Sequence, residues 1–208
     1  MRSRAAEIPA RPSARITFKD REESGVPLST YNSVAEIYEE LDDTRARLVG
    51  AVENLSDEQL GFRPSPESWS ASEIVEHLSI VEGRVARMLA VMLTKLEPEA
   101  ARAEGSSFEP VSITQFVERA RAEKYTAPEE IRPKGAPLPD SLAHLRDSRS
   151  ALRSLRERVE RVDGTRARFP HPVWGPLDLY QWLAFVGAHE RRHLSQIKAF
   201  ERTMNAER

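Results

Sequence analysis

The chain has 208 residues, which is enough for one domain with a sizeable core. It contains no cysteine, so any bound metal must be held by nitrogen and oxygen ligands, and disulfides are excluded. The net charge of −2 gives no overall attraction to nucleic acid or to an anionic membrane, and neither is expected as a partner. No stretch reaches the roughly 18 apolar residues of a membrane span, and the N-terminus lacks the apolar core of a signal peptide. We therefore expect a cytoplasmic protein.

The chain divides into an extension and one domain. Residues 1–29 are rich in proline, serine and charge and show no sustained periodicity, which indicates a flexible or loosely docked extension. A short strand or docked segment around Ile16–Phe18 is the one element considered there. Residues 30–208 form the predicted domain.

Apolar residues at helical spacing predict four long helices in this domain. Ser70 with Glu73, and Asp178 with Gln181, have the spacing of reciprocal helix caps, and Asp140 is predicted to cap the third helix. The four helices are expected from Thr30 to about Leu55, from Ser70 to near Pro98, from Asp140 to Gly164, and from Leu179 to about Met204.

The segments between these helices differ in length. Ser56 and Gln59 resemble a capping box for a short turn of helix after the first long one. Five prolines between residues 98 and 138 exclude one continuous helix there, although a short one is expected over Ile113–Ala122. Such a long connection often serves as a lid over a site. The pattern predicts an all-α four-helix bundle with a long crossover between helices 2 and 3.

Three of the five histidines lie in apolar helical stretches. His189 and His193 are four residues apart, so both side chains project from one face of the fourth helix. His77 lies on the apolar stripe of the second helix and can meet them in the bundle interior. Three imidazoles with an open position are typical of a catalytic or substrate-binding metal centre, with zinc, nickel or ferrous iron as candidates. The alternative is that these are structural core histidines, each satisfied by a hydrogen bond.

The run HERRH also matches the H-E-x-x-H signature of zinc proteases. Those enzymes take their third ligand downstream, and only fifteen residues follow His193, so His77 is the better third ligand. Glu190 is a candidate general base at the metal, or else pairs with a nearby arginine or a neighbouring helix. Gln196 either orients His193 or is a polar residue at the helix edge.

The sequence says less about the roles of the other two histidines. His171 lies in a proline-flanked turn, where it either lines the mouth of the site or packs against Trp174. His144, near the start of the third helix, is expected to be partly exposed. Trp69 and Trp182 are expected to pack at a helix start and in the core.

The segments ESWSASEIVEHL and HPVWGPLDLYQWLAFVGAHERRHLSQI resemble the DinB-like superfamily, also described as DinB/YfiT-like metalloenzymes. The resemblance covers about residues 31–205, and His77, His189 and His193 fill its three histidine positions. It implies a bundle in up-up-down-down order, often a homodimer, with one divalent metal, usually zinc or nickel. Some relatives are transferases that use bacillithiol, mycothiol or glutathione.

Three functions follow from this combination. The first is a metal-dependent enzyme acting on a small molecule, specifically a thiol-dependent S-transferase in which the metal stabilises the thiolate. The second is a hydrolase with a metal-bound water, with Glu190 as candidate base. The third is a non-catalytic metal- or ligand-binding stress-response module.

Overall fold

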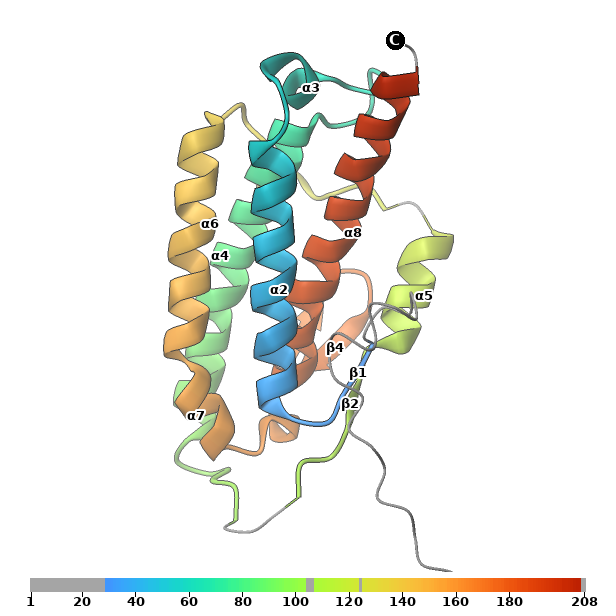
Figure 1. Ribbon diagram of the computed structural model, residues 1–208. Coiled ribbons are helices and arrows are strands. Elements are labelled where there is room, and N and C mark those ends of the chain that lie inside the picture. The colour runs from blue at the N-terminus through green and yellow to red at the C-terminus, as the bar shows by residue number, and fades with distance from the viewer. Residues whose placement is uncertain (1–28, 104–106, 124, 207–208) are drawn as a thin grey trace, which may run out of the picture.

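A computed structural model describes residues 29–103, 107–123 and 125–206. The segment Ile16–Phe18 and most of the predicted extension lie outside the described residues. Of the helices in the described part, none is both long and apolar enough to cross a membrane. Four long helices dominate the structure and run side by side, which confirms the predicted all-α bundle (Figure 1).

The bundle helices are close to their predicted ranges. Their starts carry the expected caps, because the Ser70 hydroxyl accepts from Glu73 N while the Glu73 carboxylate accepts from Ser70 N, and Asp178 and Gln181 bond reciprocally in the same way. The short helix α3 (Asp57–Gly61) also begins with the expected capping box. The four long helices are α2 (Val34–Glu53), α4 (Ala71–Leu96), α6 (Leu138–Ser154) and α8 (Leu179–Ala206).

The helices differ from the prediction at three points. Thr30–Tyr31 is strand β1 rather than the start of helix, and α2 begins only after Ser33, whose hydroxyl accepts from Glu36 N. Helix α6 begins at Leu138 with Pro137 as its cap, rather than at Asp140, because a proline is tolerated in the first turn, where its missing N–H needs no partner. The third predicted helix is also broken at Leu155, after which α7 spans Arg156–Arg161.

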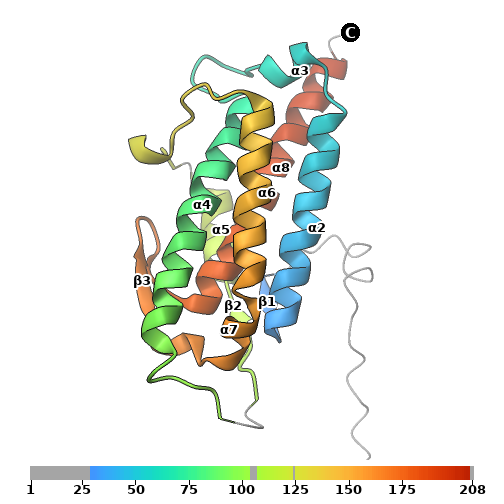
Figure 2. The same cartoon turned by 90° about the vertical axis from the view of Figure 1, so that its left-hand side faces the viewer.

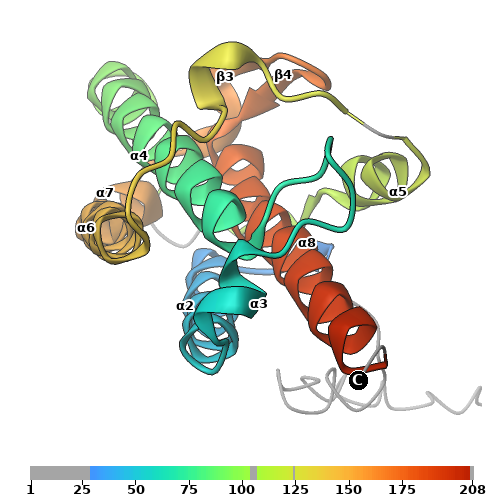
Figure 3. The ribbon, with the colours of Figure 1, turned by 90° about the horizontal axis from the view of Figure 1, so that it is seen from above.

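The long connection between α4 and α6 contains strand β2 (Val111–Ser112), helix α5 (Thr114–Ala122) and a 3-10 turn at Glu129–Ile131. Strand β2 pairs antiparallel with β1, which ties this crossover to the start of the domain. Before α8, strands β3 (Arg168–His171) and β4 (Gly175–Asp178) form a hairpin that the sequence analysis did not predict. Viewed from above, the hairpin and α5 lie outside the bundle on the side of α4 and α8 (Figure 3).

The directions of the helices follow from the two apolar clusters of the core. One cluster joins the end of α2 and the starts of α4 and α6 to the second half of α8, and the other joins the opposite ends. Along the chain the directions are therefore up, down, down, up, which differs from the up-up-down-down order implied by the resemblance (Figure 2). The short α2–α4 connection makes those helices antiparallel, whereas the long crossover carries the chain back along the bundle before α6 begins.

A buried ionic layer separates the two apolar clusters. Each bundle helix contributes one charged residue to this layer. Along each helix, that residue lies between the apolar side chains of one cluster and those of the other. Arg45 on α2 donates to Glu82 on α4 and Glu190 on α8, both at 2.5 Å. Arg149 on α6 donates to the same two carboxylates at 3.1 and 2.7 Å. Two guanidinium groups and two carboxylates thus neutralise one another in the centre of the bundle.

Replacing Arg149 with alanine is expected to lower the free energy of unfolding by about 3–5 kcal/mol, because Glu82 and Glu190 would remain buried with half of their partners removed. Arg153, one turn later on α6, is the matched control, since its pair with Asp42 is exposed and its loss should change stability by less than about 0.5 kcal/mol. Urea denaturation of both variants measures the difference. Equal effects would contradict a structural role for the layer.

A candidate three-histidine metal centre

The three predicted ligands meet where α4 packs against α8. His189 Nε2 lies 3.3 Å from His77 Nε2 and 3.1 Å from His193 Nε2, and the three ligand atoms all lie within 4.8 Å of one another. His77 and His193 are buried, at 3% and 6% exposed, and His189 is half-buried. The helix spacing therefore brings together the residues that the sequence predicted.

Hydrogen bonds hold two of these rings with Nε2 facing the centre. His77 Nδ1 lies 2.7 Å from the carbonyl oxygen of Ile131, which accepts only, so Nδ1 carries the proton and Nε2 keeps its lone pair. His193 Nδ1 lies 2.7 Å from Gln196 Oε1, which selects the same tautomer. Gln196 thus has the orienting role considered for it.

The Ile131 carbonyl is itself positioned by a buried carboxylate. Glu76, adjacent to His77 and 4% exposed, accepts three backbone hydrogen bonds from Lys134, Gly135 and Ala136 at 2.7–3.0 Å. Gly135 has φ of +86°, a conformation that glycine adopts without strain and that turns successive N–H groups toward one acceptor. Glu76 therefore fastens the end of the crossover to α4 beside the site.

All three imidazoles are held in the neutral form that metal binding requires. Burial, and then the neighbouring imidazoles, lower the pKa of His189 well below its usual value. Burial also lowers the pKa of His77 and takes that of His193 to about 3. Three neutral imidazoles whose Nε2 atoms lie together fit a borderline divalent cation and leave coordination positions open.

A cavity of about 440 Å³ lies in front of the histidines, within the size range of small-molecule sites. The crossover contributes Tyr125 to Pro128 and Ile131 to its wall, so the segment expected to cover the site does border it. The β3–β4 hairpin and the two helices supply an aromatic surface: Trp69, Phe169, His171, Trp174, Trp182 and Phe185.

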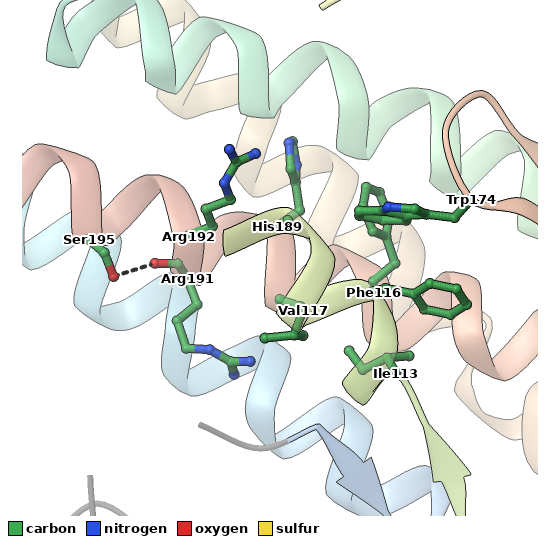
Figure 4. Close-up of a pocket in the computed structure, with 11 residues that line it drawn as sticks. Ile113, Phe116, Val117, Trp174, His189, Arg191, Arg192 and Ser195 are labelled. Atoms are coloured by element: carbon green, nitrogen blue, oxygen red, sulfur yellow. Dashed lines mark hydrogen bonds between the residues drawn. The ribbon is translucent and has the colours of Figure 1, made fainter. Parts of the chain in front are cut away.

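A second cavity of about 230 Å³ lies between α5 and α8 and shares His189, Arg192, Trp174 and Phe185 with the first. Figure 4 shows His189 and Arg192 projecting to the same side of α8, while Arg191 projects to the other side. Arg191 forms an ion pair there with Glu40 of α2. The α8 face that carries the histidines is thus open to both cavities.

Glu190 is not placed to act as a base at the metal. Its side chain is 1% exposed, its Oε1 accepts from Arg45, and its Oε2 accepts from Arg149. Because successive residues project about 100° apart around a helix, Glu190 points into the ionic layer while His189 points to the cavity. This corrects its assignment as a candidate catalytic residue and agrees with the alternative, an ion pair with neighbouring helices.

The structure also places the other two histidines and the tryptophans Trp69 and Trp182. The His171 ring stacks on Trp174 with centroids 4.3 Å apart and also lines the cavity, so both interpretations of it hold. His144 is exposed. Trp182 is buried as expected, and Trp69 packs at the start of α4 with its ring 4.8 Å from that of His77.

Comparison with known proteins identifies the family. The family model of the DinB superfamily matches residues 40–197. The uncharacterized protein YuaE of Bacillus subtilis (strain 168) is 32% identical over 164 residues, which cover 76% of this chain and 92% of YuaE. The chain therefore belongs to the DinB superfamily, which confirms the resemblance.

Two solved structures have the same fold. The four-helix bundle protein TT2238 superposes with a TM-score of 0.55 at 21% identity, over 80% of this chain and 99% of its own. YfiT from Bacillus subtilis, described as a probable metal-dependent hydrolase with an unusual four-helix bundle topology, superposes with a TM-score of 0.53 at 20% identity, over 94% of each chain.

The sequence did not reveal four parts of the site. The Ile131 carbonyl and Glu76 carry no local signal, because their roles depend on how the crossover folds back onto α4. Arg192 did carry one: it follows His189 by three residues and therefore lies on nearly the same helix face. Arg84 follows His77 by seven residues, so it lies on nearly the same face of α4 as that ligand, and it also lines the cavity.

Replacing Gln196 with leucine is expected to weaken metal binding by roughly 10–100-fold, because His193 loses the acceptor that orients its ring. Competition between the protein and a chelating indicator for zinc or nickel measures the affinity. Ser195→Ala on the exposed side of the same turn is the control and should bind like the wild type. Equal affinities for all three proteins would contradict an orienting role.

Replacing Glu76 with glutamine should loosen the end of the crossover, since one amide oxygen replaces a carboxylate that accepts three N–H groups. Hydrogen bonds to charged groups contribute about 1.5–3 kcal/mol each, so trypsin should cleave after Lys134 at least about tenfold faster. The exposed Glu67→Gln on the approach to α4 serves as control. Unchanged cleavage would show that Glu76 does not hold this segment.

Proposed function

We propose that this protein is a metal-dependent enzyme, and specifically a hydrolase of a small molecule. The observation that carries the proposal is the set of three neutral imidazoles whose Nε2 atoms converge at the wall of a cavity. A purely structural histidine would use its ring nitrogens in hydrogen bonds to the protein. Here the bonds to Ile131 and Gln196 use only Nδ1, and the Nε2 atoms face one another.

His77, His189 and His193 would hold the ion. A divalent metal bound there would supply Lewis acidity and lower the pKa of a water or thiol in its open position. The groups around the ion would orient its ligands and shape the cavity. The Ile131 carbonyl and Gln196 hold the ring protons on Nδ1, and the aromatic surface of the cavity limits access of bulk water to the reacting groups.

The description of YfiT as a probable metal-dependent hydrolase supports this proposal. At 20% identity the likeness establishes the common fold, and the hydrolytic reaction is our extension to this chain. The three-histidine cluster is the feature of this chain that agrees with that description.

A thiol-dependent S-transferase is the second candidate, and one observation favours it. No aspartate or glutamate lines the larger cavity among the described residues, and Glu190 is engaged in the ionic layer. The described lining thus offers no carboxylate to take a proton from the nucleophile. A thiol, with an ordinary pKa of about 8.5, loses its proton far more easily than water at about 15.7.

Protein purified without a histidine tag is expected to carry about one equivalent of zinc or nickel, and the His189→Ala/His193→Ala variant none, because a single remaining imidazole cannot retain the ion. Elemental mass spectrometry measures the content. Wild-type protein that stays empty after incubation with both metals would refute the metal centre.

Metal-loaded protein is then assayed with a panel of esters and amides, and with electrophiles in the presence of bacillithiol, mycothiol or glutathione. Turnover of the first panel without thiol would support the hydrolase, and turnover only with thiol would support the transferase. Stoichiometric metal without turnover in either assay would contradict an enzyme and leave a metal-binding module.

A further inference from the structure

The charged side chains in the wall of the larger cavity have the same sign. Among the described residues that line it, only Arg84 and Arg192 are charged, and both are positive. Each ligand-bearing helix supplies one of them, since Arg84 follows His77 on α4 and Arg192 lies between His189 and His193 on α8. A cavity facing a divalent cation would ordinarily gain from acidic residues, so two guanidinium groups require another explanation.

Arg192 lies near the three histidines and has no carboxylate partner in the part of the chain that the structure describes. Arg192 and all three histidines line the same cavity. Among the ion pairs of the described residues none includes Arg192, whereas its neighbour Arg191 is paired with Glu40. Figure 4 shows the Arg192 side chain on the same side of α8 as His189.

A guanidinium beside a bound divalent cation is repelled by it. An anion that lies between the two charges offsets this repulsion, because it is attracted to both over shorter distances. The fork of N–H donors on arginine fits the two oxygens of a carboxylate or another oxyanion. Arg84, exposed at the edge of the cavity, adds a second positive charge along the same wall.

The rest of the wall suits an apolar body. All three tryptophans of the chain line this cavity, together with Phe169 and Phe185. Flat aromatic side chains stack favourably on planar or alkyl groups of a ligand. The wall therefore combines a cationic side with an aromatic one.

We propose that the substrate of this site is a small amphiphilic oxyanion, such as an aromatic or alkyl carboxylate. Arg192 binds its charged group, Arg84 attracts it at the cavity edge, and the apolar body rests on the tryptophans. The reacting group then lies at the three histidines. This assignment rests on the proposed function for the reaction, but the binding of the anion depends on Arg192 and is testable without turnover.

The test uses two probes of equal shape, 3-phenylpropionate and its neutral amide, 3-phenylpropionamide. Because every tryptophan of the chain borders the cavity, quenching of intrinsic fluorescence reports its occupation. The wild type should bind the carboxylate at least about tenfold more tightly than the amide. Arg192→Gln should abolish that preference, while Lys198→Gln, an exposed charge on the same helix, should retain it.

Each titration is run on metal-free and on zinc-loaded protein. A preference in both forms that disappears in Arg192→Gln supports the inference, even if later assays find no turnover. A preference that appears only with zinc and survives in Arg192→Gln would show that the metal alone binds the carboxylate and would overturn it. Equal binding of the two probes by the wild type would also overturn it.

Two further measurements guard against a misfolded variant. Arg84→Gln, at an exposed position, should reduce the preference without removing it. In the unmodified protein, raising the ionic strength from about 0.05 to 0.5 M should reduce the preference, since salt screens a partly exposed charge pair. A preference that is unchanged in both measurements would contradict a role for the two arginines.

Discussion

The structure depends on the neutralisation of four charges in the bundle centre. Arg45, Glu82, Arg149 and Glu190 come from four different helices, and each is buried or nearly so. Isolated, any one of them would cost several kcal/mol to take out of water. Together they satisfy one another only when all four helices are aligned at the same level. Apolar side chains alone tolerate small shifts along a helix, whereas this layer specifies one alignment.

The alignment of α8 in the ionic layer also sets the geometry of the site. Glu190 and His189 are consecutive, so fixing Glu190 between two arginines fixes the height and rotation of His189. His193 follows one turn later and meets His77 across the helix contact. The residue that resembles a catalytic glutamate of the H-E-x-x-H signature is thus structural, and it stabilises the helix that carries two of the ligands.

The parts outside the bundle convert this helix contact into a cavity. The crossover supplies the Ile131 carbonyl and part of the wall, and the β3–β4 hairpin supplies His171 and Trp174. Glu76 fastens the end of the crossover beside the site. A chain of the DinB superfamily can therefore keep the bundle and its histidines while changes in these segments alter the shape and charge of the cavity. In this chain the hairpin adds aromatic side chains to the wall, while the two arginines of the cavity come from α4 and α8.

The sequence by itself determined the four helices, most of their caps and the three histidines, because helical periodicity and capping depend on residues a few positions apart. It also identified Gln196, one turn from His193. It did not determine the role of Glu190. The choice between an ion pair and a general base depends on whether the rotation of α8 directs this side chain into the bundle or toward the cavity. It missed Arg192 in the cavity wall, although that residue follows His189 by three positions on the same helix. It could not give the role of Glu76 or the order of helix directions, since these depend on contacts between segments far apart in the chain, and only the packing of the crossover and hairpin against α4 and α8 decided them.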